Sequence, residues 1–209
     1  MSRPARLYLP PGYAGIRGGP PSLILVHFEI GPVSPQGKSL APPYRQWSRS
    51  WNKQACQLME GQWKNGAVST IKDTGGTNRS SAINGMYMNL SGVVVGDLTH
   101  GIVVGTSTQA ENRDDYVLIT PVAHGNGAGQ LWYQAATNDA TLAITGGYRL
   151  VHSRQVDNNS GADIVITEMA LYGLASSFYF CFLRDVLASS YTVANGASAV
   201  GRYKVDFLV

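Results

Sequence analysis

The end of the chain shows the clearest alternation of apolar and polar residues. The apolar set is Tyr203, Val205, Phe207 and Val209, and the charged set is Arg202, Lys204 and Asp206. Because successive side chains of a strand point to opposite faces, this alternation predicts an antiparallel strand with one face on the core and one in water. Residues 178–183 are apolar throughout, so we expect a central strand that is buried on both faces.

Several short β-branched or alternating segments precede these strands, and turns rich in Gly, Asn and Asp separate them. They cover residues 68–72, 92–95, 101–105, 116–123, 130–136, 141–156 and 162–171. Pro121 marks 116–123 as an edge strand or a bulge. This spacing predicts a mainly β fold, with an antiparallel β-sandwich or jelly-roll-like domain over residues 67–209.

Residues 44–66 show the spacing of a helix. Apolar residues recur every three or four positions at Tyr44, Trp47, Trp51, Ala55, Leu58 and Met59. Pro42 and Pro43 precede this stripe and Asn65-Gly66 follows it, as at the two ends of a helix. We therefore expect one amphipathic helix over 44–66, with its apolar stripe packed on the sheet.

Residues 1–43 are rich in proline. They contain Pro4, Pro10, Pro11, Pro20, Pro21, Pro32, Pro35, Pro42 and Pro43. Since proline removes a backbone donor and fixes φ, we expect an extended arm with one short strand at 22–30. The arm either packs on its own domain or lies over a neighbouring subunit, and the sequence leaves both open.

Charge narrows the choice of partner. Charged residues make up only 14% of the chain and the net charge is +3, with Arg3, Arg6 and Arg17 as the nearest approach to a basic cluster. This scatter argues against nucleic-acid binding. No apolar run is long enough for a signal-peptide core or a membrane span, so we expect synthesis in the cytoplasm and no membrane partner. Low charge favours a surface that copies of the chain or other proteins cover.

No catalytic or metal-binding pattern stands out. The four histidines, none at metal-ligand spacing, are His27, His100, His124 and His152. Glu111, Asp114 and Asp115 lack the pattern of a calcium loop. Cys56 and Cys181 form no CxxC motif, Cys181 is expected to be a small buried residue, and a disulfide between them stays open. We expect no cofactor, no metal and no enzymatic activity.

Glu168 is a carboxylate within an apolar strand. A buried carboxylate there needs a cationic partner, for which Arg154 and Arg184 are the candidates. We expect this ion pair to be structural.

Four motifs follow one another along residues 65–209. They are GIVVGT at 101–106 with DDYVL at 114–118, AHG at 123–125 with GQLWY at 129–133, NNSGADI at 158–164 with TEMALY at 167–172, and RDVL at 184–187 with VANG at 193–196. In this order they resemble a β-sandwich domain of virion structural proteins of tailed bacteriophages. The resemblance implies a virion protein of the capsid decoration, neck, tail or fibre that binds copies of itself and other virion proteins. The proline-rich front of the chain does not map onto the pattern.

Two other functions stay open. A carbohydrate- or receptor-binding module at a tail tip would use exposed aromatics such as Trp132, Tyr133 and Tyr148 to stack on a host-surface glycan. A hydrolase with an unrecognised site is the second alternative. For assembly, the candidate contact residues are Tyr8, Tyr13, Leu23, Ile24, Val26, Phe28, Trp47 and Trp51.

Overall fold

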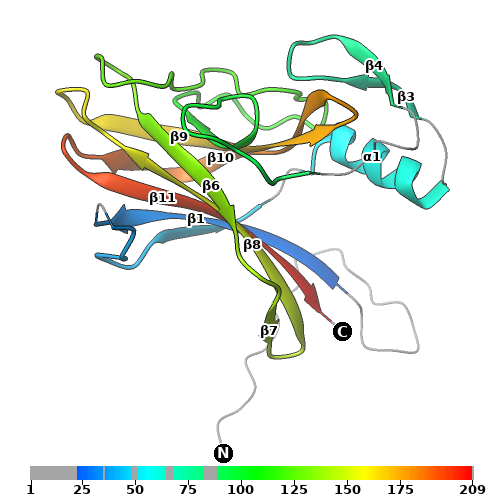
Figure 1. Cartoon of the computed structure of the whole chain (residues 1–209), viewed down its shortest axis with the longest axis horizontal. Helices are drawn as coiled ribbons and strands as arrows, with labels where there is room; N and C mark the ends of the chain where they lie inside the picture. Colours follow the sequence, from blue (N-terminus) through cyan, green and yellow to red (C-terminus); the bar gives the residue numbers. More distant parts are fainter. Residues whose placement is uncertain (1–22, 35, 49–50, 65–67, 82–88, 209) are drawn as a thin grey trace, which may run out of the picture.

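The computed structural model describes residues 23–34, 36–48, 51–64, 68–81 and 89–208 (Figure 1). The described elements are β1 (Leu23–Val33), β2 (Tyr44–Trp47), α1 (Lys53–Lys64), β3 (Val68–Lys72), β4 (Asn78–Ser81), β5 (Gly101–Gly105), β6 (Trp132–Asn138), β7 (Leu142–Ile144), β8 (Gly147–Asp157), β9 (Ile164–Ala175), β10 (Phe178–Val193) and β11 (Ser198–Leu208).

The strands form two main sheets and a hairpin. The larger sheet has the order β2-β1-β11-β8-β6, with β7 also paired to β8, and the smaller sheet has the order β10-β9-β5. β3 and β4 form the hairpin. Every pairing between these strands is antiparallel, which confirms the predicted mainly β, antiparallel character.

The two main sheets share one core. Phe28 and Tyr203 contribute to it from the larger sheet, and Val103, Met169 and Phe180 contribute from the smaller sheet. The Tyr203 hydroxyl donates a hydrogen bond to the carbonyl of Met169 at 3.0 Å, which joins the sheets directly. Burying these side chains is the main favourable contribution to folding.

The short strand expected at 22–30 within the proline-rich segment is present as β1 (Leu23–Val33), and it belongs to the larger sheet. β1 pairs with β11 on one side and β2 on the other. Phe28 and Ile30 are fully buried in the core. The pairing between β1 and β2 ends at Ile30 of β1. Pro32 lies beyond it, so the backbone N–H that proline lacks is not needed for this pairing. Residues 1–22 lie outside the described residues.

The predicted helix begins too early. Tyr44–Trp47 form the strand β2, and α1 covers only Lys53–Lys64. Between them, the half-buried Trp51 makes an isolated bridge to Leu183. The helical spacing of Tyr44, Trp47 and Trp51 is overridden by tertiary pairing, because β1 offers β2 a free backbone edge.

Candidate functional site: an uncovered apolar sheet face

One end of the larger sheet projects away from α1 and the hairpin, where Figure 1 shows the start of β1, the end of β11 and the β7–β8 hairpin. Ile24 pairs with Phe207, and Phe207 pairs with Tyr148. The buried pair Phe28–Tyr203 lies four residues further along the same strands. An even spacing keeps side chains on one face of a sheet. The apolar inner face of the sheet therefore continues past the core.

The side chains of this extension are uncovered. Their exposed fractions are 52% for Ile24, 58% for Tyr148, 43% for Leu150 and 39% for Phe207. We call these four residues the tip face. At roughly 200 Å² of surface for each large apolar residue, they expose about 400 Å². Contiguous apolar patches of this size mark interaction sites on many proteins.

The opposite face at the same end is charged and internally paired. Arg149 donates two hydrogen bonds to Asp206, at 2.6 and 2.7 Å. Burial alone would raise the pKa of Asp206, but the bonds to Arg149 outweigh it and lower that pKa below its usual value. At the end of the last strand the burial is the reverse of what the sequence predicts. Asp206 of the charged face is buried against Arg149, whereas Phe207 of the apolar face is exposed.

A pocket adjoins the tip face. Its volume is about 330 Å³, and its apolar lining includes Leu150, Val205 and Tyr203 of the larger sheet and Leu171 of β9. The polar side chains that line this tip pocket are Asn89, Ser91, Asn138, Asp139 and His152. The apolar lining and the few polar groups are typical of a binding site.

His152 is a buried titratable group in the lining of the tip pocket. Its Nδ1 lies 2.7 Å from the side-chain oxygen of Asn138, and its Nε2 has no hydrogen-bond partner among the described residues. Burial is the main cause that lowers the pKa of His152 to about 4, so the ring is neutral near pH 7.

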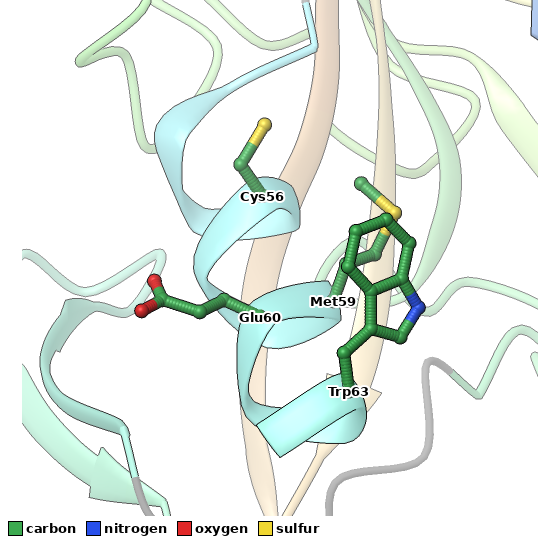
Figure 2. A pocket seen from close by; sticks show the side chains of 4 residues that line it. All are labelled: Cys56, Met59, Glu60 and Trp63. Atoms are coloured by element: carbon green, nitrogen blue, oxygen red, sulfur yellow. The ribbon is translucent and has the colours of Figure 1, made fainter.

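α1 carries a second exposed apolar surface. A pocket of about 340 Å³ on the outer side of the helix is lined by Cys56, Met59, Glu60 and Trp63 (Figure 2), and Trp63 is 85% exposed. Figure 2 shows the Trp63 ring and Met59 on one side of the helix, with Glu60 pointing to the other. A large aromatic side chain in water at the end of a helix is a common anchor in protein interfaces.

The predicted assembly residues fall into three groups. Ile24 belongs to the tip face, and Trp47 is exposed on β2, with its ring edge-on to His27 at a centroid distance of 5.4 Å. Val26 and Phe28 are core residues of this chain, so the expectation that they contact a neighbour is corrected. The half-buried Trp51 packs against the core. Of the remaining three, Leu23 belongs to β1 but its side chain is not described, and Tyr8 and Tyr13 lie outside the described residues.

The sequence does not reveal most of the tip face. The alternation along the last strand predicts that Phe207 faces the core, no pattern distinguishes Leu150, and Tyr148 is only a candidate for glycan stacking. Whether the smaller sheet covers these residues depends on the tertiary structure. The only sequence signal was their apolar character at the ends of long strands.

The aromatics proposed for glycan stacking do not form one surface. Tyr133 is fully buried, and its hydroxyl donates to the carbonyl of Val122 at 3.0 Å. Trp132 packs on His124 with ring centroids 4.4 Å apart. Of the three candidates, Tyr148 alone is strongly exposed.

Glu168 pairs with Arg184, one of the two partners expected for it. Both side chains are fully buried and lie 2.9 Å apart, and Arg184 also contacts Asp115 at 2.7 Å. Burial alone would lower the pKa of Arg184, but the hydrogen bond to Asp115 and the charge of Glu168 raise it overall. Glu111 accepts a hydrogen bond from the backbone of Val186. These acidic residues therefore hold the loop 109–115 against β10.

The other chemical candidates are resolved as follows. Cys56 and Cys181 are both free, and Cys181 is buried as expected. Among the described residues, no three His, Cys, Asp or Glu side chains are grouped closely enough to hold a metal ion. In the part of the chain that the structure describes, no helix has the length and apolar character needed to cross a membrane.

No protein-family model, curated protein or solved structure matches this chain.

Proposed function

We propose that this protein is a non-enzymatic structural protein that assembles through copies of itself. The tip face carries the proposal. It continues the core-facing side of the larger sheet, yet Ile24, Tyr148 and Phe207 are all substantially exposed. Covering such a surface releases water from apolar groups and favours association.

We further propose that the assembly is the particle of a tailed bacteriophage. The support is the order of the four motifs over residues 65–209, which resembles a β-sandwich domain of virion structural proteins. The low share of charged residues, 14%, also suits a chain whose surface is largely covered in an assembly. This support is equally compatible with a protein of the capsid decoration, neck, tail or fibre. It is also compatible with other virion proteins as binding partners.

Light scattering with sedimentation velocity tests self-assembly. We expect the full chain to form a defined oligomer or filament, and the double variant Tyr148→Ser, Phe207→Ser to be monomeric at the same concentration. Val165→Ser is the matched control, because Val165 is 46% exposed on β9 outside the tip face. A full chain that stays monomeric over the accessible concentration range contradicts the proposal.

The contribution of the N-terminal residues needs a separate comparison. Removing residues 1–43 would delete β1 from between β2 and β11 and expose the core. A chain that begins at Ser22 keeps β1. If this shortened chain and the full chain differ in oligomeric mass, the difference is due to residues 1–21 alone.

A further inference from the structure

The tip face lies where β1 begins. Leu23 is the first residue of β1, and Ile24, the next residue, belongs to the tip face. Figure 1 shows this end of β1 beside the end of β11 and the β7–β8 hairpin. Residues 1–22, here called the N-terminal segment, therefore join the described chain directly at the tip face.

The N-terminal segment has the composition of a partner for an apolar surface. Leu7, Tyr8 and Leu9 are three consecutive apolar residues, and Pro10 and Pro11 follow them. Because proline fixes φ, less conformational freedom is lost when such a segment binds. Three large apolar side chains of roughly 200 Å² each are enough to cover the roughly 400 Å² that the tip face exposes.

The charges of the two surfaces are also complementary. The N-terminal segment contains Arg3, Arg6 and Arg17 and no acidic residue, whereas the rest of the chain has as many acidic as basic residues. Asp139 is exposed in the lining of the tip pocket, and no Lys or Arg is among the described residues of that lining. Leu150 belongs to both the pocket and the tip face, so this carboxylate adjoins the apolar surface. Opposite charges beside an apolar contact fix the orientation of two partners more than they add affinity.

A direct contact between two tip faces is too small to hold two copies together. It would bury about 400 Å² on each copy, or about 800 Å² in total. Stable interfaces bury about 1,200–2,000 Å². A bound N-terminal segment buries about 400 Å² of the tip face and a similar area of itself, so two segments exchanged between two copies bury about 1,600 Å². That total is typical of a stable dimer.

A second stretch with apolar residues, 82–88, also lies outside the described residues. It connects Ser81 at the end of β4 to Asn89, which forms an isolated bridge with Leu174 of β9. Both ends of this seven-residue connection are thus fixed on its own copy, and the tip projects away from the β3–β4 hairpin (Figure 1). The N-terminal segment is therefore the better candidate for covering the tip face.

We propose that the N-terminal segment of one copy binds the tip face of a second copy, and that two copies exchange their segments around a two-fold axis; this inference rests on the self-assembly proposed above. Residues 7–9 cover the tip face of the neighbour, and an arginine of the segment pairs with Asp139. Pro20 and Pro21 favour an extended chain directly before β1, which directs the segment outward to the neighbour rather than back over its own Ile24. A two-fold exchange is closed at two copies, so the expected oligomer is a dimer.

Sedimentation velocity of the full chain and of two full-length variants tests the contact. Leu7→Ser, Tyr8→Ser, Leu9→Ser removes the apolar residues of the segment, and Leu150→Lys places on the tip face a charge that repels the arginines. We expect the unmodified chain to be a dimer and the dissociation constant of each variant to rise at least tenfold. Leu40→Ser is the matched control, because Leu40 is 65% exposed outside both surfaces. Far-UV circular dichroism verifies that each variant keeps the fold.

Disulfide capture separates exchange between copies from binding within one copy. Arg6→Cys and Asp139→Cys are introduced into separate chains, each also carrying Cys56→Ser because Cys56 is a free, exposed thiol. With oxidised glutathione as the oxidant, we expect an equimolar mixture to give a cross-linked dimer that a reductant separates. Lys38→Cys replaces Arg6→Cys in the control mixture, because Lys38 is exposed outside the N-terminal segment.

The outcomes separate this inference from the proposed function. If the full chain assembles and the triple variant at residues 7–9 assembles equally well, the exchange is wrong while self-assembly stands. A mixture that cross-links no more than the Lys38→Cys control also overturns the exchange. A chain with both Arg6→Cys and Asp139→Cys that closes its disulfide within a monomer shows that the segment covers its own tip face, which overturns the exchange as well. A monomeric full chain overturns both proposals.

Discussion

Replacing Glu168 by Leu tests whether the buried ion pair holds the smaller sheet and its loop together. Oε2 of Glu168 accepts a hydrogen bond from Arg184 at 2.9 Å, and Oε1 accepts the backbone N–H of Thr120 at 2.9 Å. Leucine removes both acceptors. The guanidinium of Arg184 then keeps Asp115 as its carboxylate partner, and the N–H of Thr120 loses its side-chain acceptor.

The expected loss follows from these two changes. Breaking a buried ion pair from one side costs about 3–5 kcal/mol, and the remaining contact to Asp115 offsets part of that cost. Thr120 is exposed, so water can replace the acceptor that its N–H loses, and this change adds little to the loss. We therefore expect the free energy of unfolding to fall by about 3 kcal/mol. That is a large share of the roughly 5–15 kcal/mol that stabilises a typical domain.

Urea unfolding followed by far-UV circular dichroism measures this change. Asp114→Ala is the control, because Asp114 is an exposed acid 3.8 Å from Lys53 and its ion pair should contribute less than about 1 kcal/mol. Glu168→Gln keeps acceptor oxygen but no charge, so its stability should lie between those of the wild type and Glu168→Leu. If Glu168→Leu loses less than about 1 kcal/mol, the network does not stabilise the fold as argued.

Three further predictions follow from buried groups. Burial lowers the pKa of His152 to about 4, so the folded state binds fewer protons than the unfolded state between about pH 6.5 and 4. The contribution of neutral His152 to the free energy of unfolding is complete above that window and falls by about 3 kcal/mol as the pH drops through it. His152→Gln should therefore flatten this part of a plot of stability against pH. An unchanged curve would refute the lowered pKa of His152. Gly173→Ala places a methyl group in the space that the ring of Phe182 occupies, so urea unfolding should show a loss of at least about 1–3 kcal/mol. An unchanged midpoint would count against this packing. In a thiol-reagent assay of the native protein, Cys56 should react and Cys181 should not, because burial raises the pKa of the Cys181 thiol; modification of both without denaturant would contradict this.

The sequence by itself determined the β character of the chain and its most buried pieces. Residues 178–183 are apolar on both faces and lie in β10, and 101–105 form the fully buried β5. The need of Glu168 for a cation also followed from the sequence, because a charge in an apolar strand is costly without a partner. These inferences rest on local composition, which tertiary packing preserved.

Other local patterns were overridden. The predicted strand over 116–123 contains only an isolated bridge, from Pro121 to Gly105, because proline limits strand pairing. Tyr44–Trp47 has helical spacing but forms β2, since the backbone edge of β1 provides hydrogen-bond partners that spacing cannot reveal. The strand expected at 22–30 is present as β1, but its position inside the larger sheet, where Phe28 and Ile30 fill the core, is set by tertiary packing.

The candidate site was decided by the tertiary structure alone. The alternation along β11 correctly places Tyr203 and Phe207 on one face, but it cannot show that the smaller sheet covers Tyr203 and leaves Phe207 exposed. That difference depends on where a second sheet ends, which no local pattern encodes. Sequence periodicity therefore assigns a residue to a face, whereas only the packing of one layer on another decides whether that face is core or surface.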